Sequence, residues 1–191
     1  MNANTALLLI DIQQGLDDPC WGNRNNPDAE TNMCAVLTRW RSQGWPVIHI
    51  QHCSTEAGSP LRPDCAGVAF KPATAPVDDE PIIQKQVNSA FIGTNLETML
   101  RKRKLDSLVV VGLTTDHCVS TTVRVAANKG FSVILVGDAT ATFDRTAPDG
   151  AYIDADTMHT VSLASLNREF CTVAATRDLL GNGEPSLADV Q

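Results

Sequence analysis

The sequence predicts an α/β protein: a three-layer sandwich on a Rossmann-like, six-stranded, mostly parallel sheet with helices on both faces. Short apolar runs rich in Val, Ile and Leu alternate with longer segments of helical period, a pattern typical of parallel strands joined by crossover helices. No Gly/Ser-rich linker or internal repeat interrupts the 191 residues. We therefore expect a single domain over 1–191, long enough to bury a full core.

The expected elements follow in order from these runs. Strands are predicted at about 5–12, 46–51, 81–85, 107–112, 132–137 and 168–173. Helices are predicted at about 28–43, 94–104, 117–129 and 154–166, with a short one after Thr176. Pro27 and Asp28 form a helix start, while Gly44 and Gly130 follow two expected helix ends as caps.

The charge pattern argues against a nucleic-acid or membrane partner, and the partner expected is a small-molecule substrate. The formal net charge is −7, and the one dense basic run, residues 101–104, falls where a helix should end. Cations there complement the negative end of the helix dipole, so we expect neither a nucleic-acid surface nor a membrane surface.

The N-terminal region and the cysteines indicate a cytoplasmic protein. The first residues carry no basic segment, and Asp11 interrupts the apolar stretch 6–10, so neither a signal peptide nor a membrane span is expected. The six cysteines include no CxxC pair, and we expect them to be reduced thiols.

One long segment, residues 53–79, contains four prolines and no regular period. A loop of this length in a compact domain is usually a functional lid or a subunit contact, although a plain surface excursion is the alternative.

Three reactive side chains are expected at the carboxyl ends of the predicted strands. Asp11 lies near the end of the first strand, Lys85 ends the third, and Cys118 lies in the loop after the fourth. Because βα loops converge beyond those ends, the three should share one edge of the sheet. Each has an ordinary alternative: a loop or helix-capping aspartate, a solvated strand-end lysine, and a buried core thiol.

Together the three side chains form a candidate reaction centre. A thiol attacks as the thiolate, and its pKa falls at a helix N-terminus or beside a cation, which the positions of Cys118 and Lys85 would supply. Asp11 could accept the thiol proton and deliver it to a leaving amine. Backbone N–H groups of the loop before the helix would then face the oxyanion of a tetrahedral intermediate.

The histidines are weaker candidates. His117 adjoins Cys118, but neighbours on a helix point about 100° apart, so it is poorly placed as the base for that sulfur. His49 and His52 lie three apart on a strand and should project to opposite faces, which argues against a shared metal. We expect His52 to line the pocket, His49 to pack in the sheet, and His159 to have a structural or interface role.

Three separated segments carry a family pattern. They are LLLIDIQQGL (7–16), KQVNSAF (85–91) and GLTTDHCVSTTVRVAANKGFSVILVGDATATFD (112–144). In this order they resemble the isochorismatase-like cysteine hydrolases across nearly the full chain. The resemblance implies a catalytic triad of Asp11, Lys85 and Cys118. It also implies a non-proline cis peptide at Leu113–Thr114, and an oxyanion hole at Thr114 and Cys118.

The resemblance also narrows the expected chemistry. Nicotinamidases carry an Asp-x-His metal motif after the second strand, where this chain reads IHIQHCS without an aspartate. A site without metal or other cofactor is therefore expected. Isochorismatases that hydrolyse a vinyl ether lack the nucleophilic cysteine, so Cys118 implies cleavage of a small amide or carbamoyl compound through a thioester. The alternatives are a vinyl ether hydrolase and a catalytically silent binding protein of the same fold.

The remaining expectations concern the pocket wall and the assembly. Asp138, after the fifth strand, is expected to fix a loop. Similar enzymes often associate, so we expect a homo-oligomer, a dimer or larger. Side chains near strand ends or in the adjoining loops are expected to bind substrate: Gln13, Leu16, Trp21, His52, Phe91 and Thr115.

Overall fold

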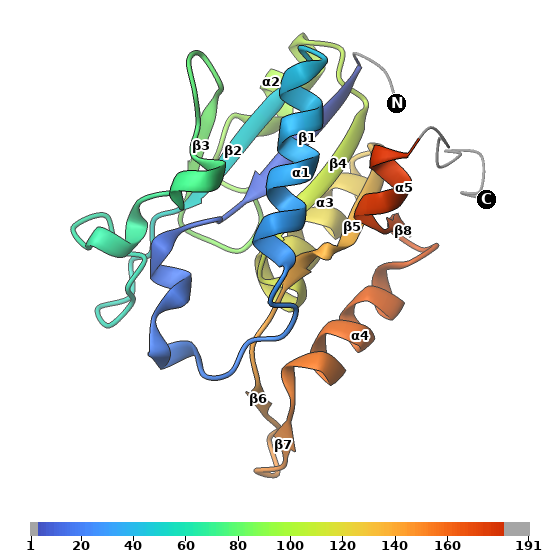
Figure 1. The fold of residues 1–191 in the computed structure, drawn as a ribbon. Coiled ribbons are helices and arrows are strands. Elements are labelled where there is room, and N and C mark those ends of the chain that lie inside the picture. Colours follow the sequence, from blue (N-terminus) through green and yellow to red (C-terminus); the bar gives the residue numbers. More distant parts are fainter. Residues whose placement is uncertain (1–3, 182–191) are drawn as a thin grey trace.

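The computed structural model describes residues 4–181 and contains a central sheet with helices on both sides (Figure 1). Six strands lie in the order β3-β2-β1-β4-β5-β8, and all of their pairings are parallel. The expected α/β sandwich is therefore confirmed. The strands are β1 (Thr5–Ile10), β2 (Val47–His52), β3 (Ile82–Lys85), β4 (Ser107–Leu113), β5 (Ser132–Ala141) and β8 (Thr172–Ala174).

Five α-helices and several short helical turns connect the strands within the described residues. The helices are α1 (Ala29–Ser42), α2 (Leu96–Lys102), α3 (Ser120–Asn128), α4 (Ala155–Leu166) and α5 (Thr176–Leu180). The turns are η1 (Gln14–Asp17), η2 (Pro19–Trp21), η3 (Ala66–Val68), η4 (Pro72–Thr74) and the π-helical turn η5 (Thr115–Val119).

The sheet is buried on both faces, which explains the continuous apolar runs in the sequence. Side chains of β1 alternate between the faces: Leu7 and Leu9 pack with α1 and α5, whereas Leu8 and Ile10 pack with α2 and α3. Figure 1 shows α1 and α3 on opposite sides of the sheet. The two cores hold the strand ends, and therefore the loops that follow them, in fixed positions.

Several element boundaries differ from the prediction. The last strand was expected at 168–173 but spans only Thr172–Ala174, because Arg168 has a φ of 72° in the turn that follows α4. β5 continues beyond residue 137 to Ala141. The antiparallel pair β6 (Arg145–Thr146) and β7 (Tyr152–Ile153) was not predicted, since two-residue strands leave no periodic pattern.

The strand order places a ligand-binding crevice beside β1. The chain runs outward from β1 to β3 and then returns to the other side of β1 as β4. In open parallel sheets ligands bind at such a reversal, beyond the carboxyl ends of the strands. Gly112 of β4 pairs with Ile10 of β1, where a Cβ would lie 2.1 Å from the Ile10 carbonyl oxygen. Only glycine permits this approach.

Within residues 4–181, no helix combines the length and apolar character needed to cross a membrane. The cytoplasmic location and the homo-oligomer stay predictions.

Candidate active site

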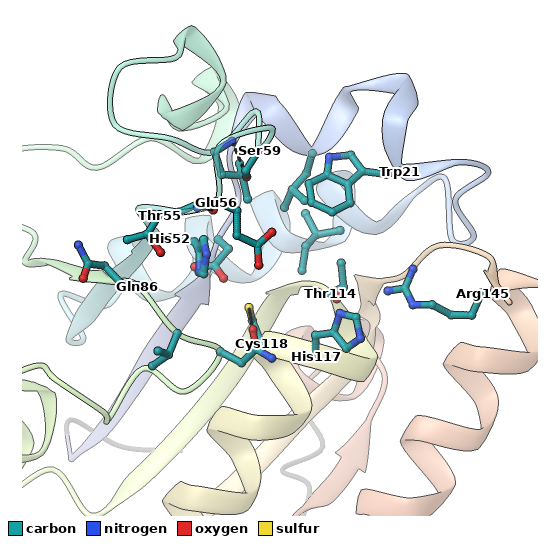
Figure 2. Close-up of a pocket in the computed structure, with 17 residues that line it drawn as sticks. Trp21, His52, Thr55, Glu56, Ser59, Gln86, Thr114, His117, Cys118 and Arg145 are labelled. Atoms are coloured by element: carbon teal, nitrogen blue, oxygen red, sulfur yellow. Dashed lines mark hydrogen bonds between the residues drawn. The ribbon is translucent and has the colours of Figure 1, made fainter. Parts of the chain in front are cut away.

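A cavity of about 670 Å³ lies at the carboxyl ends of β1 and β4 (Figure 2). Its lining comes from the loops that follow β1 to β5, and it includes Asp11, His52 and Cys118. The crevice predicted from the strand order is therefore hollow and contains reactive side chains.

Lys85 connects the reactive groups at the base of this cavity. Its Nζ atom donates to Asp11 Oδ2 at 2.6 Å and to Cys118 Sγ at 3.2 Å. The same atom lies 3.0 Å from His52 Nδ1. The Lys85 and Asp11 side chains are almost fully buried, at 0% and 1% exposed. The structure thus brings together the three side chains that the sequence placed on separate strands.

Local backbone geometry positions Cys118. The residue lies in the wide turn η5, and regular α3 begins only at Ser120, so the expected helix 117–129 has two parts. The His117 and Val119 amides donate to the Thr114 carbonyl at 3.2 and 3.1 Å, and the Cys118 amide between them takes part in neither bond. The Leu113–Thr114 peptide before this turn is cis. π-Helical turns are frequent at functional sites.

The charge of buried Lys85 is compensated by Asp11 and helps to set the protonation state of His52. Burial disfavours the charged form of Lys85, but the Asp11 carboxylate outweighs it and raises the lysine pKa above its usual value. Burial and the Lys85 charge lower the pKa of His52, so its imidazole is neutral at neutral pH. Because an ammonium can only donate, His52 Nδ1 is the acceptor and its proton resides on Nε2.

The expected activation of Cys118 by a lowered pKa is wrong. Burial and the Asp11 carboxylate raise the pKa of the Cys118 thiol, and Lys85 offsets this only in part. Cys118 is therefore a neutral thiol at neutral pH, and a neutral thiol has to lose its proton when it acts as a nucleophile. Asp11 Oδ1 is buried without a hydrogen-bond partner within the part of the chain that is described, so one oxygen is free to accept that proton.

The same groups could in principle hold a metal ion. One Asp11 oxygen, one His52 nitrogen and Cys118 Sγ all lie within 4.8 Å of one another, and each is a zinc ligand in other proteins. However, Lys85 Nζ contacts all three residues and provides the compensating positive charge. A metal ion would have to displace a buried ammonium, so the metal-free site stays our prediction.

Comparison with known proteins agrees with this geometry. The family model described as the isochorismatase domain matches residues 5–178. The chain belongs to the isochorismatase family of hydrolases.

Two family members match most of the chain, and one amidase matches a part of it. The isochorismatase family protein YrdC of Bacillus subtilis is 46% identical over 182 residues, covering 95% of this chain and 97% of its own. A crystal structure of a family member from Chromobacterium violaceum is 47% identical, with a TM-score of 0.90 over 94% of this chain and 93% of that one. N-carbamoylsarcosine amidase from Arthrobacter is 48% identical over 61 residues, which are 32% of this chain and 23% of the amidase.

Three of the six expected substrate-binding residues of this isochorismatase-family chain do line the cavity: Leu16, Trp21 and His52. Trp21 is fixed there because its indole Nε1 donates to the Gly15 carbonyl at 2.8 Å. Its ring also stacks on Phe143, with centroids 6.0 Å apart.

The other three expected residues are turned away from the cavity. Gln13 is fully buried, and its side-chain amide bonds both backbone groups of His52, at 3.0 and 2.8 Å. Phe91 is 8% exposed and packs on Phe131. Thr115 is buried, with its hydroxyl 2.9 Å from His159 Nδ1. All three are near strand ends in the sequence, but their side chains support the fold.

His49 and His117 lie apart from the reacting groups. His49 Nε2 lies 2.8 Å from Glu80 Oε2, so this histidine is paired within the sheet layer. His117 lines the cavity, but its ring faces Asp116 at 3.5 Å, and no hydrogen bond joins it to Cys118 among the described residues.

Sequence reasoning missed much of the wall formed by residues 53–79. Ser54, Glu56 and Ser59 line the cavity (Figure 2). Hydrogen bonds from Gln14 N to Ala69 O and from Lys71 N to Ile12 O, at 2.8 and 2.9 Å, fasten the later part of this segment beside η1. The segment is therefore a docked wall of the site. The missed residues Asn88 and Arg145 also follow strand ends, which is the signal that could have identified them.

Proposed function

We propose that this hydrolase cleaves the C–N bond of a small amide or carbamoyl compound through a thioester on Cys118. The observation that carries the proposal is the contact of one buried ammonium, Lys85 Nζ, with both the Asp11 carboxylate and the Cys118 sulfur at a cavity. The partial match to an enzyme named as an amidase supports the same class of bond.

The first half of the reaction forms the thioester. As Cys118 Sγ bonds to the substrate carbonyl carbon, its proton moves to the free Oδ1 of Asp11. The carbonyl oxygen becomes an oxyanion that the backbone amides of Thr114 and Cys118 stabilise by hydrogen bonds. Asp11 then returns its proton to the leaving nitrogen, the C–N bond breaks, and ammonia or an amine departs.

The second half repeats these steps with water. Asp11 takes a proton from a water molecule as its oxygen bonds to the thioester carbon. The C–S bond breaks, and the proton on Asp11 restores the Cys118 thiol. The net reaction consumes one water molecule and yields an acid and an amine or ammonia.

Lys85 acts by holding charge. Its ammonium stabilises the negative charge that passes between sulfur and carboxylate, and the raised pKa of Lys85 keeps it protonated throughout. Because it is buried with Asp11, this charge is weakly screened by solvent.

An ammonia-release screen over primary amides, ureido compounds and carbamoyl acids would identify a substrate. With that substrate, we expect Cys118→Ala to reduce kcat by a factor on the order of 10⁴ or more, as for other removed nucleophiles. Rapid quenching of the wild type should reveal an acylated peptide containing residue 118 by mass spectrometry. Cys34→Ala, on α1, is the matched control and should retain full turnover.

Each other outcome would contradict the proposal. Turnover that survives Cys118→Ala would indicate chemistry without a nucleophilic thiol, such as vinyl ether hydrolysis. Substrate binding without turnover in the wild type would indicate a silent binding protein.

A further inference from the structure

We propose that Glu56 selects amides that carry a protonated amine. This inference rests on the proposed amide hydrolysis and names a substrate class for the same site. It comes from the charged groups that line the cavity or lie buried beneath it: among residues 4–181, Glu56 is the one without a hydrogen-bond or ion-pair partner.

The two cations at this site are neutralised by their own partners. Lys85 Nζ lies 2.6 Å from Asp11 Oδ2. Arg145 binds Asp116 Oδ2 through Nε at 2.9 Å and through Nη2 at 2.8 Å, and Asp116 is only 6% exposed. Neither cation is therefore left with an uncompensated charge to attract an anionic substrate.

Glu56 is the unpaired charge. Its side chain lines the cavity, and across residues 4–181 its carboxylate makes no hydrogen bond or ion pair. Figure 2 shows the carboxylate directed into the cavity, on the same side as His52 and opposite Arg145. A substrate bound over Cys118 would lie close to this negative charge, and a cationic substituent would complete the pairing.

Glu56 is exposed, and hydrogen bonds of the loop around it fix its backbone at the rim of the cavity. The Glu56 amide donates to Ser54 Oγ at 3.2 Å, and the Ser54 amide donates to the Leu61 carbonyl at 3.0 Å. Leu61 and Trp21 line the same cavity, and apolar wall strengthens a charge pair relative to open water. The Trp21 ring could also attract a cation through its face.

Three primary amides of similar size test the selection: β-alaninamide (cationic), butanamide (neutral) and succinamate (anionic). For the wild type we expect kcat/KM to be highest for β-alaninamide, about fivefold above butanamide, the upper range for a partly exposed ion pair. Glu56→Gln keeps the size but removes the charge, so the ratio should fall to about one. Raising the salt concentration should also lower the wild-type ratio of kcat/KM for β-alaninamide to that for butanamide, because salt screens the charge of Glu56.

Glu97→Gln, which alters a surface ion pair with Lys129, is the matched control and should keep the wild-type ratio. An unchanged ratio in Glu56→Gln, or a wild type that prefers succinamate, would overturn the selection by Glu56.

Binding to Cys118→Ala separates this inference from the proposed function. Calorimetry should show tighter binding of β-alaninamide than of butanamide, and this difference should vanish in Cys118→Ala/Glu56→Gln. If the wild type cleaves none of the amides but this order of affinity holds, the selection stands and the hydrolytic proposal for these amides fails. Equal affinities in Cys118→Ala would overturn the selection whatever the enzyme cleaves.

Discussion

Cys118 and Cys171 pack against the same hydrophobic core but have different neighbours. Cys171 is 2% exposed, and its Sγ contacts the Leu166 carbonyl at 3.7 Å. Cys118 contacts the Lys85 ammonium at 3.2 Å and lines the cavity. Burial raises the pKa of both thiols, that of Cys171 to about 12.

The comparison separates acidity from reactivity. A low thiol pKa cannot be what distinguishes the candidate nucleophile, because both thiols are neutral at neutral pH. What distinguishes Cys118 is its neighbours: a carboxylate oxygen without a hydrogen-bond partner among residues 4–181, an ammonium, and a cavity. These neighbours suit the proposed transfer of a proton during attack, for which a resting thiolate is not required.

Removing the proton acceptor should therefore have a large effect on both turnover and stability. We expect Asp11→Asn to reduce kcat by about 10² to 10⁴, the usual contribution of a general base. The same substitution leaves the buried Lys85 ammonium without its counter-charge, so the free energy of unfolding should fall by about 3 to 5 kcal/mol. Steady-state kinetics and urea denaturation measure the two effects.

Asp138→Asn is the control for this experiment. Asp138 Oδ1 accepts from the Thr176 amide and hydroxyl at 2.7 and 2.8 Å, so its loss also removes a structural carboxylate. The free energy of unfolding of Asp138→Asn should fall, while the variant retains its turnover. Equal loss of turnover in both variants would show that destabilisation, and not the base, explains the Asp11 result.

Much of the fold could be predicted because both faces of the sheet are buried. The apolar runs that marked the strands are residues such as Leu7 to Ile10, packed alternately against two helical layers. Asp138 was expected to fix a loop, and it does so by binding the start of α5 at Thr176. Short or irregular elements such as β6, β7 and η5 depend on tertiary contacts and left no periodic signal.

The site was predictable in part for a related reason. Strand order places residues at a sheet edge, so Asp11, Lys85 and Cys118 could be expected together from chain position alone. Side-chain direction is a different matter: Gln13 and Thr115 lie equally close to strand ends, yet they turn into the protein. The pKa of Cys118 also depends on burial and on the distance to Asp11, which the sequence does not contain.

Alkylation tests whether Asp11 suppresses the thiolate. Because burial and the Asp11 carboxylate raise the pKa of Cys118, we expect slow labelling by iodoacetamide in the wild type at neutral pH. Asp11→Asn should label about tenfold faster, equivalent to a fall of one pKa unit, even though it hydrolyses substrate more slowly.

Peptide mapping by mass spectrometry gives the rate at each cysteine. Cys171 should stay unlabelled in both folded proteins because it is almost inaccessible. Slower labelling of Cys118 in Asp11→Asn would contradict the electrostatic role given to Asp11.

Cys171→Ala should have the smallest effect, confined to stability. Folding raises the Cys171 pKa from 9.0 to about 12, so the unfolded thiol ionises first as pH rises. Its contribution to stability is therefore full below about pH 9 and is lost as pH rises toward 12. Urea denaturation should show the wild type more stable by about 1 kcal/mol at neutral pH, with this advantage shrinking above pH 9. If the difference in free energy of unfolding between the wild type and Cys171→Ala did not change with pH, Cys171 would have the same pKa in the folded and unfolded states. That result would contradict the raised pKa of Cys171.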